Sequence, residues 1–289
     1  MMILVTGATG RVGRPLINLL RIAGAGVRAV SRDATEAELP AGVEVVEGDP
    51  SRPDTVADAL DGVTSLFLHP RAVGDGAADL VDLARRRGVR RVVALAAINI
   101  DDDPSEQPSR LAGDRNREAE EAAAGSGLEW TSLRPSFFAA NAITMWGAQI
   151  RAGDVVRYAY PDVSESPIHE HDIASVAVHA LLTDDLVGRR VELTGPQTLT
   201  HAEMVGVIGD VLGRPLRYEE LDPGVAAERM VAHGLPEPFV TALLARYARI
   251  AGTRQPPSDD VEKVLGRPAV AFAQWVADHA AAFTFEDRR

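Results

Sequence analysis

The chain has 289 residues, of which 46% are hydrophobic and none is cysteine. Without cysteine there is no disulfide framework, thiolate nucleophile or thiolate metal site. The formal net charge of −12 argues against a nucleic-acid surface, which needs a basic stripe. The N-terminus has no basic leader, and no apolar run reaches about 18 residues, so we expect a cytoplasmic protein without a signal peptide or membrane span.

The first 135 residues alternate short apolar runs with amphipathic stretches. Such near-continuous apolar runs are typical of parallel strands that are buried on both faces. Strands are predicted at 2–6, 26–31, 43–47, 63–68, 91–95 and 128–133, with helices at 11–23, 53–60, 75–88 and 109–125. This alternation predicts an α/β fold, a doubly wound parallel sheet of the Rossmann type.

The second half of the chain is predicted to be mostly helical. Helices are expected at 136–150, 171–183, 222–234, 236–251, 258–266 and 270–283, with a strand at 190–194. Thr200 and Glu203 form a capping box for a further helix to about 212. We therefore expect a sheet domain over 1–155, to which 165–195 return, and a smaller, mostly helical C-terminal cap over 196–289. The crevice between them is the expected substrate site.

A glycine-rich loop, "VTGATGRVG", follows the first predicted strand and opens the first helix. Its glycines Gly7, Gly10 and Gly13 allow a sharp turn, a close phosphate and tight packing of helix on strand. Phosphate binds at such a helix N-terminus because free N–H groups and the helix dipole favour negative charge. The loop predicts nucleotide binding.

The end of the second strand bears on which nucleotide is bound. NAD-specific folds place an acidic residue there for the ribose 2′-hydroxyl. This strand ends at Ser31 and Arg32, and an arginine would instead bind a 2′-phosphate. Arg11 can reach the same side, whereas Asp33 favours NAD(H). We expect NADP(H), with NAD(H) as the alternative, and Asp49 accepting a bond from the adenine.

Later motifs are more specific. Together with the glycine loop, "VRAVSRD", "SGLEWTSLRPSFFAAN", "DIASVAVHALL" and "VELTGPQTLTHAEM" resemble the NmrA-like atypical short-chain dehydrogenases, most closely the triphenylmethane reductase and quinone oxidoreductase type-2 branch. The resemblance implies an NAD(P)-binding Rossmann domain, with either reduction of quinone-like and other conjugated acceptors or redox sensing without turnover. The implied cofactor residues are Gly7, Thr9, Gly10, Arg11, Val12, Arg32, Asp49, Leu68, His69 and Pro135. We add Gly13, Ser31, Ala96 and Phe137, because of their places in the glycine loop and after the predicted strands.

The Ser-Tyr-Lys set of ordinary short-chain dehydrogenases is missing. Ala96 and Ala97 stand where the serine is expected, and the helix after them has neither tyrosine nor lysine. A His often fills the position of Asn116 in the nearest branch. The acceptor must then be reactive by itself, with orientation supplying up to about 7–11 kcal/mol. Its aromatic pocket is predicted from Phe137, Phe138, Met145 and Trp146, with ordinary helix packing as the alternative.

Catalytic candidates are few. His69 closes the fourth strand and is a weak proton-donor candidate, as is Asn116, while the plainer reading of His69 is that its backbone lines the cofactor. His169 and His171 lack an evident third ligand, so we expect no metal.

The sequence thus predicts an NADPH-dependent reductase of a small quinone-like or other conjugated aromatic acceptor, in secondary metabolism. A non-catalytic NADP(H)-binding redox sensor is the alternative. The sequence sets neither the substrate nor the oligomeric state.

Overall fold

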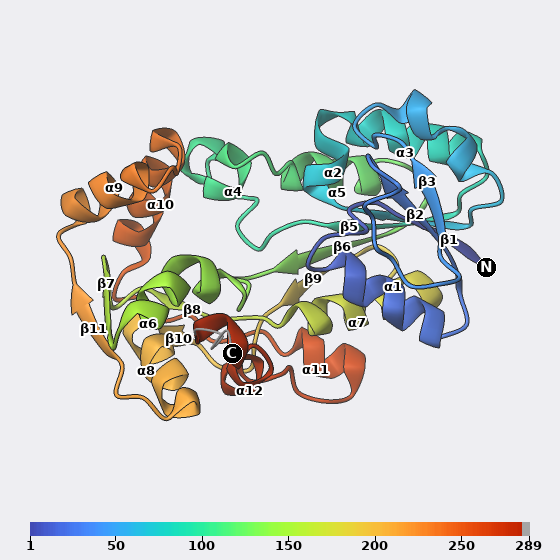
Figure 1. Ribbon diagram of the computed structural model, residues 1–289. Helices are drawn as coiled ribbons and strands as arrows, with labels where there is room; N and C mark the ends of the chain where they lie inside the picture. Colours follow the sequence, from blue (N-terminus) through green and yellow to red (C-terminus); the bar gives the residue numbers. More distant parts are fainter. Residues whose placement is uncertain (285–289) are drawn as a thin grey trace.

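A seven-stranded sheet forms the centre of the computed structural model, which describes residues 1–284 (Figure 1). Its order is β3-β2-β1-β4-β5-β6-β9, and every neighbouring pair is parallel. The strands are β1 (Met2–Val5), β2 (Gly26–Ser31), β3 (Glu44–Glu47), β4 (Ser65–Leu68), β5 (Arg91–Leu95), β6 (Glu129–Pro135) and β9 (Arg189–Leu193). The predicted Rossmann-type α/β fold is confirmed, with its switch point between β1 and β4.

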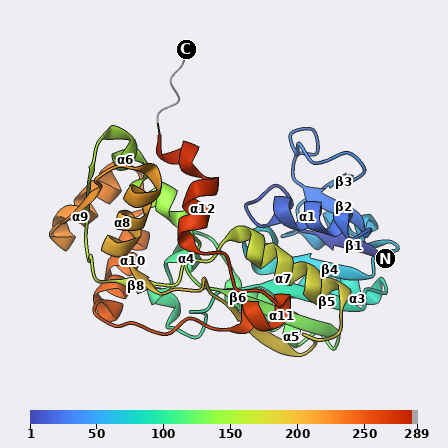
Figure 2. The same cartoon turned by 90° about the horizontal axis from the view of Figure 1, so that it is seen from below.

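Helices cover both faces of this sheet (Figures 1 and 2). One face carries α1 (Gly13–Ile22) and α7 (Glu170–Leu182), and the other carries α3 (Ala77–Arg86) and α5 (Asn116–Ala124). Side chains alternate between the two cores as the strand pleat requires. In β1, Ile3 and Val5 pack with α1, whereas Leu4 packs with α3.

The C-terminal lobe has a hydrophobic core of its own. It contains α8 (His201–Leu212), α9 (Pro223–Ala232), α10 (Glu237–Ile250) and α12 (Phe272–Asp278). Two small sheets join them, β7 (Val155–Tyr158) with β11 (Arg217–Glu220) and β8 (Ser164–Glu165) with β10 (Leu199–Thr200). The capping box of Thr200 and Glu203 is present at the start of α8. The core is aromatic, since Trp146, Phe272 and Trp275 are buried in it.

One late helix returns to the sheet. In α11 (Asp260–Leu265), Val261 is buried in the same core as α1 and α7. The Asp260 carboxylate accepts the Glu192 N–H of β9, at 3.0 Å, and so covers the edge of the sheet. The predicted cap over 196–289 therefore includes a segment that packs on the other lobe, and its last five residues lie outside the described part.

Two predicted helices are shorter than expected. The helix predicted at 53–60 is a pair of 3-10 turns, Pro53–Val56 and Asp58–Leu60. The helix predicted at 109–125 is interrupted between α4 (Pro108–Leu111) and α5, where Gly113 has a φ of +100°. A left-handed residue cannot continue a right-handed helix.

The helix predicted at 136–150 also starts late. β6 extends to Pro135, and Phe138 forms a bridge with Ile168 before the helical turns begin. The segment Ile143–Gly147 is a π-helix that leads into α6 (Ala148–Ala152). Among the described residues, no helix is both long and apolar enough to cross a membrane.

Candidate functional site

Four adjacent strands end at one edge of the sheet. β1, β4, β5 and β6 are neighbours, and the chain leaves them toward Gly7, His69, Ala96 and Phe137 respectively. Parallel strands place their carboxyl ends together, so residues far apart in sequence meet there. Leu68 and Pro135 are the buried last residues of β4 and β6. The fold thus brings the predicted nicotinamide-side residues to one edge.

The glycine loop has no room for side chains at two positions. Gly7 has a φ of +65°, and a Cβ there would lie 2.6 Å from Cγ of His69. At Gly13 a Cβ would lie 2.2 Å from the carbonyl oxygen of Gly7 and 2.7 Å from that of Ala8. Gly13 thereby lets α1 begin directly against the loop.

The loop is fixed to β4 through one hydroxyl. Thr6 Oγ1 donates to the Phe67 carbonyl at 2.9 Å and accepts the His69 N–H at 2.8 Å. Within the described chain, the backbone N–H groups of Thr9, Arg11 and Val12 have no acceptor. Free N–H groups at the start of a helix suit a phosphate. The residues present therefore fit the diphosphate of a dinucleotide.

His69 lies directly under this loop. Its side chain is half-buried, and its Nδ1 is buried without a partner among residues 1–284. Burial lowers the pKa of His69, with Asp114 only partly opposing the effect. His69 is therefore neutral at pH 7, which makes it a hydrogen-bonding group more than an acid.

The far end of the loop carries the groups that bear on NADP(H). Arg11 and Arg32 are both exposed, and neither side chain makes an ion pair or hydrogen bond to any described residue. Asp33 is engaged by its own loop, since its Oδ1 accepts the Thr35 N–H at 2.9 Å and the Glu36 N–H at 3.2 Å. The arginines are available for a phosphate, while one oxygen of the competing carboxylate is already bonded within its own loop.

Two further predicted cofactor residues, Ser31 and Asp49, form hydrogen bonds within their own loops. Ser31 Oγ donates to the Asp33 carbonyl at 2.6 Å. The Asp49 carboxylate accepts from Ser51, at 3.0 Å from the N–H, and pairs with Arg52 at 3.1 Å. Although burial opposes it, the Ser51 hydroxyl in particular lowers the pKa of Asp49. Its adenine contact stays a prediction.

The positions of the missing set offer little acid–base chemistry. Ala96 is buried, and its N–H donates to Leu133 at 2.8 Å. Asn116 begins α5 and donates to the Ser109 hydroxyl at 3.2 Å. Lys263, the only lysine of the sequence, lies in α11, where it pairs with Asp259. No lysine can therefore hold the ribose at α5.

The four predicted pocket residues divide between two cores. Phe137, Met145 and Trp146 belong to the core of the C-terminal lobe, whereas Phe138 packs against the sheet core. Phe137 and Met145 are half-buried, and Trp146 is fully buried. The pocket stays a prediction, and of its four members Phe137, Phe138 and Met145 are partly accessible whereas Trp146 is fully buried.

Sequence reasoning missed one histidine in this region. His201 is fully buried, and its ring centroid lies 5.5 Å from that of Trp146 and 5.0 Å from that of Tyr247. In the sequence it is only the second residue of a capping box, and nothing in that pattern indicates burial. Its neighbours are distant in the sequence, since Tyr247 is 46 positions away and Trp146 is 55.

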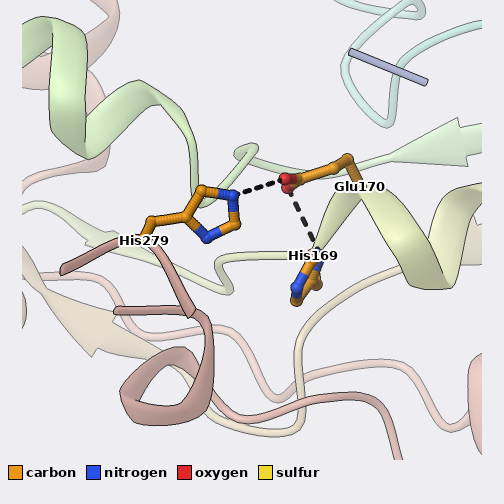
Figure 3. A group of neighbouring side chains, drawn as sticks. All are labelled: His169, Glu170 and His279. Carbon is orange, nitrogen blue, oxygen red and sulfur yellow. Dashed lines mark ion pairs between the residues drawn. The ribbon is translucent and has the colours of Figure 1, made fainter. Parts of the chain in front are cut away.

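A second histidine cluster joins α7 to α12 (Figure 3). Glu170 lies between two imidazoles, 3.4 Å from Nδ1 of His169 and 3.1 Å from Nε2 of His279. Trp275 Nε1 donates to the same carboxylate at 3.0 Å. His169, Glu170 and His279 are close enough to one another to share a metal ion.

The hydrogen bonds of His169 oppose a three-ligand metal site. His169 caps α7, because its Nδ1 accepts the His171 N–H at 3.0 Å. In the neutral ring the single lone pair is then on Nδ1 and the proton lies on Nε2, which faces Asp278 at 3.7 Å. When the ring is protonated, Nδ1 carries a proton as well, gives up the cap and faces the Glu170 carboxylate. His169 has no lone pair for a metal while it caps the helix. The cluster instead ties the two helices together by charge.

Comparison with known proteins agrees with this geometry. Residues 7–184 match the model of the NAD(P)H-binding family, and the chain belongs to that family. It is an NAD(P)H-dependent oxidoreductase, and the predicted resemblance to NmrA-like reductases is confirmed.

Two curated relatives span nearly the whole chain. A (4-alkanoyl-5-oxo-2,5-dihydrofuran-3-yl)methyl phosphate reductase of Streptomyces griseus is 36% identical and covers 99% of this chain and 100% of its own length. An NAD(P)H azoreductase of Xenophilus azovorans is 35% identical over 98% of this chain and 99% of its own.

Solved structures show the same fold at lower identity. An NADPH complex of a quinone oxidoreductase from Escherichia coli has a TM-score of 0.82 at 22% identity, covering 96% of this chain and 100% of that one. A triphenylmethane reductase of Citrobacter sp. with NADP(H) has a TM-score of 0.79 at 22% identity, covering 97% and 100%.

Proposed function

We propose that this protein uses NADPH to reduce a conjugated double bond in a small, flat acceptor that is quinone-like or activated by carbonyl groups. One observation carries the proposal. Where ordinary short-chain dehydrogenases place a proton donor, β5 is followed by Ala96 and Ala97, and α5 has neither tyrosine nor lysine. An acceptor that needs no protein acid suits such an edge.

When bound, the reduced nicotinamide supplies the hydride. The N–H groups of the glycine loop would hold its phosphates, and Ala96, His69 and Phe137 follow strands that end at the same edge of the sheet, where the nicotinamide would lie. Hydride addition to a conjugated acceptor moves an electron pair onto the acceptor's own oxygen or nitrogen, where it is delocalised. Water then delivers the proton. A simple ketone would form a localised alkoxide, for which the described edge offers no charged acid.

The two relatives support this class of acceptor. The name of the first describes a ring double bond conjugated with the ring carbonyl and the alkanoyl carbonyl. The name of the second describes reduction of an azo bond. The preference for NADPH is supported by the exposed side chains of Arg11 and Arg32 and by the internal bonds of Asp33.

The test is a turnover assay with purified protein, NADPH and three probes: menadione, an azo dye and an α-acetylbutenolide. We expect at least one probe to accelerate the loss of NADPH absorbance and to give the two-electron reduced product. A simple aliphatic ketone is the control and should be inert. Tight NADPH binding without turnover of any probe would overturn the proposal and favour the redox-sensor alternative.

A further inference from the structure

The C-terminal lobe holds an unusual buried histidine. His201 is 0% exposed, and neither ring nitrogen has a hydrogen-bond partner within residues 1–284. Buried polar side chains are nearly always bonded. An unbonded one costs about 1–3 kcal/mol. Two unpaired nitrogens on one ring therefore point to a ligand that reaches this place.

A second unpaired group lies beside it. Trp146 Nε1 is buried and also lacks a partner among the described side chains, and the two ring centroids are 5.5 Å apart. Trp146 lies in the π-helix Ile143–Gly147, a form that often marks functional sites. Because the rings are this close, one small polar group can lie within reach of both.

The charges around His201 select the ligand chemistry. Burial, reinforced by the nearby charge of Arg246 and only partly opposed by the nearby backbone of Tyr160, lowers the pKa of His201 to about 3. The geometry of the Tyr160 contact is not that of a hydrogen bond. The ring is therefore neutral and has one N–H and one lone pair. Arg246 is itself paired with Glu165 at 2.7 Å, so it adds little net charge. Such surroundings suit a neutral acceptor such as a carbonyl oxygen.

Aromatic rings surround the histidine and suit a flat molecule. The ring centroids of Phe137, Tyr158 and Tyr247 lie 6.5, 6.2 and 5.0 Å from that of His201. Phe137 and Met145 are half-buried and pack against this core. Methionine is flexible enough to move aside.

Phe137 also connects the cluster to the reacting edge. It comes two residues after Pro135, the last residue of β6, at the edge where the glycine loop and His69 lie. Its ring centroid lies 6.5 Å from that of His201, so Phe137 is a neighbour of both the edge and the histidine.

We infer that His201 and Trp146 form the inner, polar end of the substrate pocket, where their N–H groups hold a carbonyl oxygen of the conjugated acceptor. The inference rests on the proposed function and names the binding residues of that same site. These residues bind and orient the acceptor, and they take no part in hydride transfer.

The experiment compares His201→Phe, His201→Gln and Trp146→Phe with wild type, using menadione and NADPH. A neutral hydrogen bond is worth about 0.5–1.5 kcal/mol, so His201→Phe and Trp146→Phe should each raise KM about threefold to tenfold. NADPH affinity should be unchanged, which also shows that the variants fold. His201→Gln keeps a donor and should restore a KM near wild type. The exposed His233→Phe is the control.

The outcomes separate the two proposals. If wild type reduces menadione and His201→Phe leaves KM unchanged, this inference is wrong and the proposed function stands. If wild type reduces no probe, the proposed function fails, and calorimetric titration of menadione into the NADP⁺ complex decides the inference. Weaker binding by His201→Phe and Trp146→Phe supports it, and equal binding or no binding overturns it.

Discussion

At Gly13 a single methyl group decides whether the phosphate loop can form. The Cβ of an alanine would lie 2.2 Å from the Gly7 carbonyl oxygen, which is backbone and cannot rotate away. We therefore expect Gly13→Ala to lower the free energy of unfolding by about 1–3 kcal/mol through overpacking. It should also abolish NADPH binding. Urea denaturation and a fluorescence titration with NADPH measure the two effects.

Gly206 is the matched control for this substitution. It lies in the middle of α8, and a Cβ there meets nothing within 4 Å. Alanine in a helix is favoured over glycine by about 1 kcal/mol, so Gly206→Ala should stabilise the protein and bind NADPH normally. Normal NADPH binding by Gly13→Ala would contradict the role given to the loop.

Arg32 is expected to discriminate between the two dinucleotides. Its guanidinium is exposed and makes no ion pair with a described residue, and hydrogen bonds to charged groups are worth about 1.5–3 kcal/mol. Arg32→Ala should weaken NADPH binding about tenfold or more and leave NADH almost unchanged. Dissociation constants for both cofactors check this, with the exposed Arg21→Ala as the charge control. Equal losses for NADPH and NADH would refute a 2′-phosphate contact.

Residues of the loop could be predicted because their signal is local. Three glycines between a strand and a helix, and an arginine after the next strand, are readable without tertiary structure. His201 is different, since its environment is made by Trp146 and Tyr247 from other segments. Ala96 was predicted only as a position, and its buried hydrogen bond to Leu133 depends on the pairing of β5 with β6.

Between elements, Glu120 joins α5 to two strands. It is 3% exposed and accepts from Ser132 and Arg134 of β6, and from Arg190 of β9. Burial would raise its pKa, but these three donors outweigh burial and lower it to about 2. Glu120 is thus a buried, charged carboxylate that joins three side chains from two strands, and we call it the Glu120 hub.

Replacing this hub should be costly at neutral pH. Glu120→Gln leaves Arg134 with only the exposed Asp101 as its anion. Breaking a buried pair costs about 3–5 kcal/mol, of which solvent screening at the half-exposed Arg190 removes a part. Because the folded pKa lies below 4.5, the contribution is present above pH 4.5 and is lost as pH falls toward about 2. Chemical denaturation across this range measures it, with the exposed Glu121→Gln as control. A flat difference between the variants down to about pH 2 would contradict the hub role.

His169, at the contact between α7 and α12, contributes to stability with the opposite pH dependence to Glu120. Burial alone would lower the pKa of His169, but the hydrogen bond and charge of Glu170 raise it above 6.5. Although burial opposes them, His169 and other donors lower the pKa of Glu170 to about 2. The His169 contribution is therefore full below pH 6.5 and is lost as pH rises through the folded pKa.

We accordingly expect Glu170→Gln to destabilise the protein more at about pH 5.5 than at about pH 8.5. The amide oxygen still accepts from Trp275, so the substitution removes mainly the charge. Unfolding free energies of wild type and variant at both pH values give the comparison. A larger loss at the higher pH would exclude an ion pair with His169.

The sequence predicts elements well where the pattern is local and continuous. The apolar runs of the sheet and the capping box of α8 are such patterns. β7 and β11 were missed because their short sequences, VVRY and RYEE, mix apolar with charged residues, and because they pair across about 60 positions. The late start of the helix after β6 depends on the bridge between Phe138 and Ile168, which no local pattern indicates.

For the whole molecule, the chain path fastens the two lobes to each other. After the C-terminal lobe, residues 258–270 run back along the sheet lobe. Ser258 N–H donates to Thr194 at 3.0 Å, and Arg267 and the Val270 N–H both donate to Asp172, each at 2.7 Å. Asp172 is 0% exposed at the start of α7. Because of these bonds, we expect the C-terminal helices and the sheet lobe to unfold together.

This arrangement predicts one unfolding transition, which Asp172→Asn should lower as a whole. The amide can still accept the Val270 N–H, but the charge that holds Arg267 is lost, at about 1.5–3 kcal/mol. Trp130 reports on the sheet lobe and Trp275 on the other lobe, so single-tryptophan variants can follow each by fluorescence. We expect coincident midpoints in wild type and an equal shift of both in Asp172→Asn. Separate midpoints would mean that the lobes are stable independently, and that residues 258–270 only connect them.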